Sequence, residues 1–253
     1  MIANYHTHTP RCNHATGAER EYVEAALAAG LEILGFSDHS PCVFPGDYRS
    51  WHRMGLEELE SYVTTVLGLR EEFRDRIQIP LGLELEYYPG LMPELLPILR
   101  DQPIDYLLLG QHFLGDEMGE PYCGHATADE NVLKRYCDQT IGGMQSGLFL
   151  YLAHPDLIHF VGDTDIYRGH MRRLCREAKA CGLPLEWNLL GQCSGRHYPV
   201  MGFWELAAEE GCDVILGWDA HKPDAMSNTA ALDHALLCIR KLELNLLDTV
   251  PLR

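Results

Sequence analysis

Short apolar runs alternate with amphipathic helical stretches along the chain, and this alternation limits the possible folds more than any other feature. It is typical of β-α units that build a parallel sheet. Strands are expected near Ile2–Tyr5, Ile33–Ser37, Ile79–Leu85, Tyr106–Gly110, Phe149–Ala153, Pro184–Asn188 and Val214–Gly217. Helices are expected near 18–30, 56–74, 92–100, 129–146, 168–181, 200–210 and 228–241, and long loops at 40–55 and 113–128. Seven β-α units in 253 residues favour an α/β barrel over an open sheet, as one domain covering residues 1–253.

Six of the seven expected strands end in residue types that bind metals. These residues are His6 and His8, Asp38 and His39, Glu84, His112, His154, and Asp219 and His221. The carboxyl ends of parallel strands share one rim, and barrels build their active sites there. In an extended HxH or DxH segment, residues i and i+2 point the same way and can share a metal site. The sequence therefore predicts a metal cluster at this rim.

The number and type of these residues indicate more than one ion. With His14 from a nearby loop, the candidate ligands are His6, His8, His14, His39, Glu84, His112, His154, Asp219 and His221. Nine ligands are too many for one ion, so we expect two to three divalent transition metal ions, with Glu84 as a bridge. Imidazole with carboxylate suits zinc, iron or manganese. Asp38 and Glu86 are expected to contact ligands rather than metal.

Isolated histidines carry less weight, because a single histidine at a strand end is more often an ordinary polar residue than a ligand. We expect the remaining histidines to be ordinary residues: His52, His125, His159, His170, His197 and His234. His197 is the one among them with a possible role at the site.

The charge balance narrows the class of partner. The chain has 20 Lys+Arg against 37 Asp+Glu, a formal net charge of −17, which argues against binding of long nucleic acid. A small phosphorylated substrate stays compatible, because bound cations would offset the charge locally. No apolar run approaches the roughly 20 residues that span a bilayer, and the first residues lack the pattern of a signal peptide. We therefore expect a cytoplasmic protein with no membrane contact, and nothing in the sequence indicates its oligomeric state.

The ordered motifs HTHT, SDHS, GLE, GQH, AHPD and DAH resemble the polymerase and histidinol phosphatase (PHP) superfamily over residues 4 to about 224. The stretch HTHTPRCNHATG followed by FSDHSP is similar to the histidinol-phosphatase branch. This resemblance implies a distorted, TIM-like (β/α)7 barrel with a trinuclear metal site at the carboxyl ends of its strands. It implies one ion held by His6, His8, Glu84 and Asp219, a second by Glu84, His112 and His154, and a third by His14, His39 and His221.

The same resemblance suggests substrate contacts. Histidinol phosphatases of this branch carry an arginine in an SGxR stretch after the sixth strand, and here SGR ends in Arg196. A guanidinium can bind phosphate oxygens in a bidentate manner, so Arg196 is a candidate phosphate clamp. Arg168 and His197 are further candidate substrate contacts. Asp219 is a candidate catalytic residue, because the leaving group would be stabilised by a metal or receive a proton from Asp219 or a nearby histidine.

The expected activity is hydrolysis of a small phosphomonoester such as L-histidinol phosphate by a metal-dependent phosphatase. Three alternatives stay open: a phosphodiesterase or nuclease acting on small nucleotides, a metal-dependent amidohydrolase, and a PHP module without catalytic activity. Amidohydrolases usually bridge their metals with a lysine, whereas Glu84 takes that place here. Inactive modules often lose ligands that this chain retains.

Overall fold

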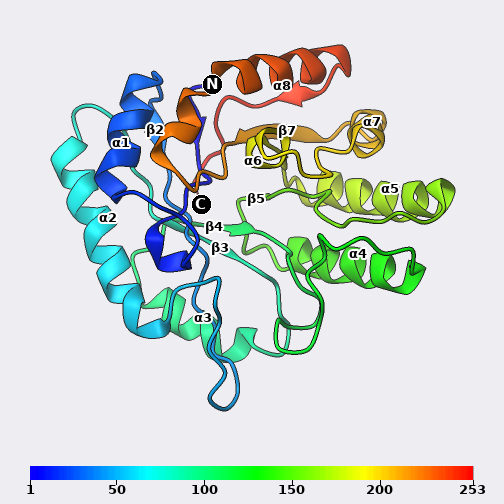
Figure 1. Ribbon diagram of the computed structural model, residues 1–253, viewed down its shortest axis with the longest axis horizontal. Coiled ribbons are helices and arrows are strands. Elements are labelled where there is room, and N and C mark those ends of the chain that lie inside the picture. The colour runs from blue at the N-terminus through cyan, green and yellow to red at the C-terminus, as the bar shows by residue number, and fades with distance from the viewer. Residues whose placement is uncertain (253) are drawn as a thin grey trace.

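The strands lie at the centre of the molecule and the helices surround them (Figure 1). The structure is a computed structural model and describes residues 1–252. The strands are β1 (Ala3–Asn4), β2 (Ile33–Leu34), β3 (Gly82–Leu85), β4 (Tyr106–Leu109), β5 (Tyr151–Leu152), β6 (Leu185–Asn188), β7 (Asp213–Gly217) and β8 (Asn245–Leu246). The helices are α1 (Glu19–Ala28), α2 (Leu59–Phe73), α3 (Met92–Arg100), α4 (Glu130–Gln145), α5 (Thr164–Cys181), α6 (Leu189–Cys193), α7 (Met201–Glu209) and α8 (Thr229–Lys241). Short 3-10 helices are η1 (Pro10–Cys12), η2 (Leu56–Glu58) and η3 (Pro223–Ser227).

Parallel pairing arranges the strands in a ring. β1 pairs with β2, and β3 to β8 form a second sheet in chain order. Isolated parallel bridges connect the two sheets: His39 pairs with Glu84 of β3, and Thr7 pairs with Ala220 after β7. β8 pairs with the amino-terminal end of β7, where Asp213 lies opposite Asn245. The predicted distorted (β/α)7 barrel is confirmed.

Aromatic side chains fill the inside of the ring below the strand ends. The Tyr5 ring packs edge-on against Tyr106 and Tyr151, with ring centroids 5.8 and 6.4 Å away. The Tyr106 hydroxyl donates to the backbone carbonyl of Tyr5 at 2.7 Å. Gly82 makes room for this ring, because a Cβ at that position would lie 2.3 Å from Cζ of Tyr106. The barrel interior is therefore a packed floor beneath the candidate site.

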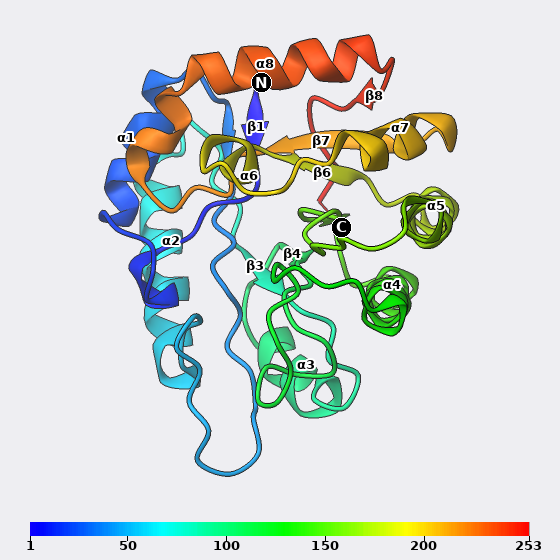
Figure 2. The same ribbon diagram turned by 45° about the vertical axis from the view of Figure 1, so that its right-hand side comes forward.

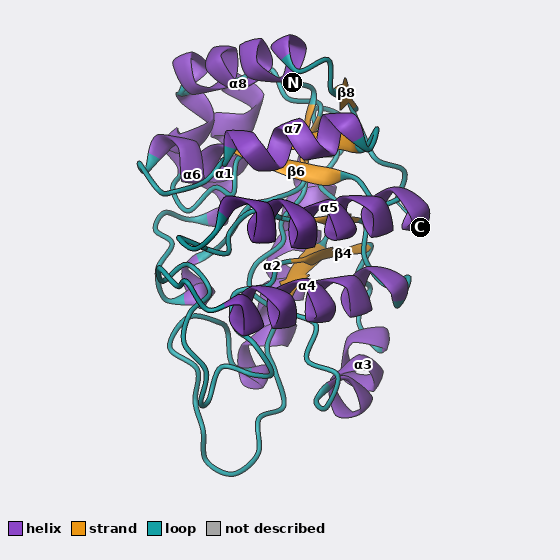
Figure 3. Ribbon diagram, turned by 90° about the vertical axis from the view of Figure 1, so that its right-hand side faces the viewer, coloured by secondary structure: helices purple, strands orange, loops and turns teal. Residues whose placement is uncertain are grey.

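The outer helices are held to the ring by apolar faces. Helices α4, α5 and α7 lie side by side on one flank (Figure 3). The side chain of Asp163 accepts the backbone N–H groups of Asp165 and Ile166 and so caps the start of α5. The buried residues of α5 recur at the spacing of one helix face: Tyr167, Met171, Leu174, Cys175 and Ala178.

Some parts of the fold differ from the sequence-based expectation. Helix α6 and strand β8 were not predicted, and regular strand structure at β2 covers only Ile33–Leu34. The two expected loops are confirmed, and the one at 40–55 extends away from the barrel (Figure 2). Throughout residues 1–252, no helix combines the length and apolar character needed to cross a membrane. The nine cysteines are all free thiols.

Candidate metal centre

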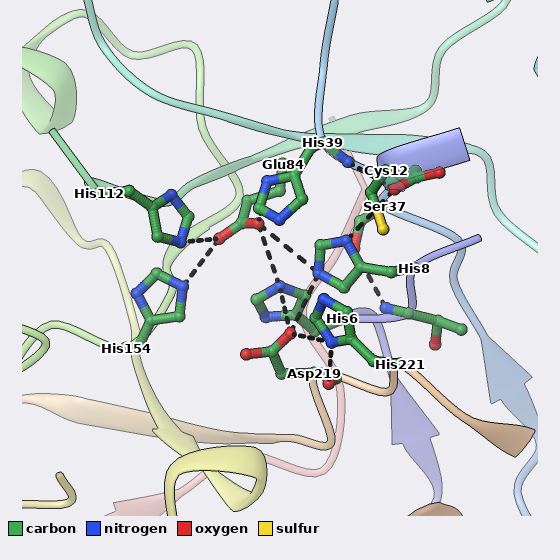
Figure 4. Close-up of polar contacts among 12 residues, drawn as sticks. His6, His8, Cys12, Ser37, His39, Glu84, His112, His154, Asp219 and His221 are labelled. Atoms are coloured by element: carbon green, nitrogen blue, oxygen red, sulfur yellow. Dashed lines mark hydrogen bonds and ion pairs between the residues drawn. The ribbon is translucent and has the colours of Figure 1, made fainter. Parts of the chain in front are cut away.

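The Glu84 carboxylate is the centre of the predicted cluster. Glu84 belongs to β3, and its side chain is buried. Its two carboxylate oxygens face histidines from four other segments (Figure 4). Its Oε1 lies 2.8 Å from Nε2 of His154 and 3.7 Å from Nε2 of His112. Its Oε2 lies 3.0 Å from Nδ1 of His39 and 3.6 Å from Nε2 of His8. One carboxylate thus reaches ligand-type atoms on two sides, as a bridging ligand would.

Asp219 gathers the remaining candidates on the other side of the cluster. Its Oδ1 lies 3.1 Å from Nε2 of His8 and 3.5 Å from Nε2 of His6. His221, two residues along the chain, places Nδ1 3.3 Å from the same oxygen and Nε2 3.0 Å from Nε2 of His14. The structure therefore brings all nine predicted ligands to one place.

The polar atoms of the cluster fit a divalent cation. Several are buried and have no hydrogen-bond partner in the described part of the chain: Nε2 of His6 and His8, Nδ1 of His39 and His154, and Oε2 of Glu84. Leaving a buried polar atom unpaired is costly, and these atoms converge. Groups such as His6–His8–Asp219 and His14–His39–His221 place ligand atoms within 4.8 Å of one another. Nitrogen and carboxylate donors so arranged are those that zinc, iron or manganese use.

Two of the candidate ligands have unusual backbone conformations. His154 and Asp219 have positive φ angles of 29° and 48°. Such angles are uncommon for residues other than glycine and cost energy that the surrounding structure must offset. Each residue lies two positions after the end of a strand, β5 or β7, so the strained turn directs its side chain toward the cluster.

The cluster keeps its acidic members ionised. Burial would raise the pKa of Glu84, yet the neighbouring histidines, His112 and His39 first among them, hold this pKa well below its usual range. Burial opposes ionisation of Asp219 as well, and His6, His8 and His221 hold its pKa well below the ordinary value. Ionised carboxylates bind cations, so Asp219 is better suited to that role than to donating a proton.

Further carboxylates lie behind the imidazole rings. Glu86 Oε1 is 2.9 Å from Nδ1 of His112, and Asp38 Oδ1 is 3.4 Å from Nδ1 of His8. Glu86 and Asp38 thus contact ligand-type histidines, as expected. Carboxylates in this position fix the ring orientation and the tautomer of a metal-binding histidine.

A cavity of about 620 Å³ opens above the cluster. Arg196 and His197 line it, together with the aromatic side chains of Trp51, Phe113 and Tyr122. The Arg196 guanidinium donates from Nη1 to the Tyr198 hydroxyl at 2.9 Å. His197 contacts the Leu157 carbonyl through Nε2 at 2.8 Å and stacks on His159, and burial lowers the pKa of its imidazole to about 4. His197 is therefore a neutral side chain near neutral pH.

The expectation that Arg168 contacts substrate is wrong. Arg168 lies on α5 and points to α7, where its guanidinium pairs with Glu205 at 3.5 Å and Glu209 at 3.4 Å. It does not line the cavity. The physical reason is the helix: α5 begins at Thr164, so position 168 lies within a regular helix beside α7 and not in the loop above the strand ends.

Several residues at the site were not predicted from the sequence. His52 and His125, expected to be ordinary, line the cavity. Glu186 contacts Nδ1 of His6 at 2.8 Å, and Arg53 contacts Glu86. For Glu186 a signal was available, since it is a charged residue inside the apolar strand sequence LEWN.

Comparison with known proteins finds relatives over most of the chain. The family model described as PHP domain matches residues 4–189. A protein of Deinococcus radiodurans named probable histidinol-phosphatase is 34% identical over 228 residues, which cover 88% of this chain and 87% of that protein. The histidinol-phosphatase of Bacillus subtilis is 32% identical over 116 residues, 43% of each chain.

Solved structures give the same fold. The histidinol phosphate phosphatase of Lactococcus lactis, solved with zinc, L-histidinol and phosphate, superposes with a TM-score of 0.76 at 22% identity. The alignment covers 98% of this chain and 96% of that one. At this identity the similarity establishes the architecture of the barrel.

Proposed function

This chain belongs to the PHP domain family, and we propose that it is a metal-dependent phosphatase that hydrolyses a small phosphomonoester, with L-histidinol phosphate as the first candidate. The relative in Deinococcus radiodurans that matches over 88% of this chain carries the name of a probable histidinol-phosphatase. That match supports both the phosphatase activity and the candidate substrate.

One structural observation carries the proposal. An anionic cluster suited to cations and a cationic guanidinium line the same cavity, because Glu84, Asp219 and Arg196 all contribute to its wall. A phosphomonoester requires this combination, since its terminal phosphoryl group carries two negative charges that must be offset in the transition state. A phosphatase activity therefore explains why carboxylates and an arginine line the same cavity.

We assign the ions to three groups of ligands. His6, His8, Glu84 and Asp219 would hold one ion, Glu84, His112 and His154 a second, and His14, His39 and His221 a third. The short distances from Glu84 to His154 and from Asp219 to His8 support the first two groups. Bound ions would act as Lewis acids that activate water and offset charge on the phosphoryl oxygens.

The chain's own residues would bind and orient the substrate. The Arg196 guanidinium would bind the phosphoryl oxygens, held in place by its contact with the Tyr198 hydroxyl. The aromatic side chains of Trp51, Phe113 and Tyr122 would contact the leaving group. Planar aromatic walls suit a planar, partly apolar group such as an imidazole.

A substrate panel tests this function directly. We expect the purified protein to carry two to three equivalents of transition metal by elemental analysis. We also expect it to hydrolyse histidinol phosphate faster than other phosphomonoesters, nucleotide diesters or amides when assayed with manganese, zinc and iron. Preferred turnover of a diester or an amide would replace the proposal by the corresponding alternative. Less than one equivalent of metal after growth in supplemented medium would contradict the metal cluster.

Arg196→Ala is expected to weaken monoester hydrolysis more than diester hydrolysis. A charge-assisted contact contributes on the order of 1.5–3 kcal/mol, which corresponds to roughly a 10- to 150-fold loss in kcat/KM. A diester carries one negative charge fewer than a monoester, so it gains less from contact with the Arg196 guanidinium. Arg196→Lys should restore activity only in part, because lysine lacks the planar guanidinium that binds two oxygens at once. Steady-state kinetics on a matched monoester and diester measure this.

Arg168→Ala is the matched control for the Arg196 experiment. Arg168 pairs with α7 outside the cavity, so its removal should leave kcat/KM unchanged. Small and equal losses on both substrates in Arg196→Ala would show that Arg196 does not bind the phosphoryl group.

A further inference from the structure

Strand β6 (Leu185–Asn188) ends without any of the nine candidate ligands, and yet its polar side chains lie at the cluster. Glu186 and Asn188 are 0% and 1% exposed. As residues i and i+2 of one strand, they point to the same side. Buried polar groups of this kind require a reason, since an apolar side chain would cost less to bury.

We infer that Glu186 and Asn188 are positioning residues of the metal centre. They set the orientation of three candidate ligands, His6, His154 and Asp219, and do not themselves bind an ion. This inference rests on the metal centre of the proposed function. It adds that these two side chains orient the ligands before a metal ion binds.

Glu186 fixes the tautomer of His6. Its Oε1 lies 2.8 Å from Nδ1 of His6 and also accepts the Tyr151 hydroxyl at 3.2 Å. A carboxylate oxygen accepts hydrogen bonds, so this contact favours a proton on Nδ1 of His6 and leaves Nε2 free to bind a metal. Nε2 is the atom that has no hydrogen-bond partner and lies 3.5 Å from Asp219. The ring is thus aligned with its free nitrogen toward the cluster.

The second oxygen of Glu186 supports the strained turn at His154. Glu186 Oε2 accepts the backbone N–H of His154 at 3.1 Å, and that residue has a φ of 29°. The same oxygen accepts Nδ2 of Asn188 at 2.9 Å. Hydrogen bonding from a buried carboxylate offsets part of the cost of an unusual backbone conformation. One carboxylate therefore acts on ligands from two different strands.

Asn188 links this carboxylate to Asp219. Its Nδ2 donates to Asp219 Oδ2 at 3.1 Å as well as to Glu186, and its Oδ1 accepts the N–H of Gly191 at the start of α6. The amide thus places a donor between two carboxylates that would otherwise repel each other. Since Asp219 Oδ2 is held by Asn188, Oδ1 is the oxygen directed at His8 and His6.

The neighbouring strand is adapted to the Glu186 carboxylate. Gly217 of β7 pairs with Asn188 in the parallel register. A Cβ at position 217 would lie 1.8 Å from Glu186 Oε1, so only glycine leaves space for the side chain. All four partners of the carboxylate are donors, and glutamine would place an N–H₂ group against some of them.

The test compares metal affinity in the full-length wild type, Glu186→Gln and Asn188→Ala. Dissociation constants for manganese and zinc are measured with a competing chelator, together with the visible spectrum of the cobalt-substituted protein. We expect each variant to bind metal about 10- to 100-fold more weakly, the usual effect of losing a group that orients a ligand, and to show altered cobalt bands. Asp105→Asn, which removes a carboxylate beside the opposite end of β4, should bind like the wild type.

The outcomes separate this inference from the proposed function. A wild type that binds no metal contradicts the proposed function itself. A wild type that binds metal, with Glu186→Gln and Asn188→Ala equal to it in affinity and cobalt spectrum, overturns the inference alone. If Glu186→Gln does not fold by circular dichroism, Asn188→Ala decides, because it leaves the carboxylate and its three other donors in place.

Discussion

Glu84→Gln is expected to abolish hydrolysis while leaving the barrel folded. The carboxylate is 1% exposed, and its oxygens face histidines on both sides of the cluster. An amide has a similar volume but no charge, so it would lose the attraction for two ions at once. Removing a single electrostatic stabiliser costs on the order of 10²- to 10³-fold in kcat, and we expect Glu84→Gln to lose at least that much.

Turnover, metal content and circular dichroism are measured together for Glu84→Gln and for His154→Ala. His170→Ala is the matched control, because His170 lies on α5 and contacts Glu130 at the surface. It should retain full activity. Wild-type turnover in Glu84→Gln after metal repletion would rule out Glu84 as a ligand, and unchanged metal content would separate a catalytic loss from a binding loss.

The ring and most of its helices could be predicted from sequence because hydrophobic periodicity determines them locally. The buried apolar residues of α2, for example, lie three to four positions apart along one helix face: Leu59, Tyr62, Val63, Val66, Leu69 and Phe73. Strand β8 has no such pattern, since it consists of Asn245 and Leu246 and exists through its pairing with β7. Helix α6 spans five residues, which is too short to show the helical periodicity of apolar residues. Tertiary context creates both elements.

The ligand set could be predicted for a different reason. His6, His112 and His154 each follow an apolar run, so topology alone places them at one rim. Not every residue that acts through others gives such a positional signal. Arg53, for instance, lies in a long loop whose path no local pattern predicts. The prediction for Arg168 failed because α5 begins at Thr164, four residues before the expected helix start at 168, so Arg168 lies inside the helix and pairs with α7.

Arg53 joins the two long loops to the metal centre. Its guanidinium is buried and contacts Glu86 through Nη1 at 2.8 Å and Nη2 at 2.9 Å. It contacts Glu117 through Nε at 2.9 Å and Nη2 at 2.7 Å. Glu86 in turn contacts His112. One cation therefore compensates two buried carboxylates, one after β3 and one in the loop 113–128.

Arg53→Met is expected to cause the largest loss of stability among single substitutions near the site. Removing one partner of a buried ion pair leaves an uncompensated charge and costs about 3–5 kcal/mol. For a chain of this size, Tm falls by about 2–4 °C per kcal/mol, so a drop of roughly 6–20 °C is expected. Thermal unfolding followed by circular dichroism measures it. Arg53→Met/Glu117→Gln should recover part of the loss, because one of the two unpaired charges is then absent.

The Arg53→Met effect should also depend on pH. Burial would raise the pKa of Glu117, but contacts with His52 and Arg53 lower it below the ordinary value. A lowered pKa in the folded state contributes stability above the unfolded pKa, and that contribution is lost as the pH falls through the folded value. Without Arg53 this contribution shrinks or reverses. The difference in unfolding free energy between wild type and Arg53→Met should therefore be larger at pH 7 than near pH 4. A difference that stays constant with pH would mean that lost packing, and not unpaired charge, destabilises the variant.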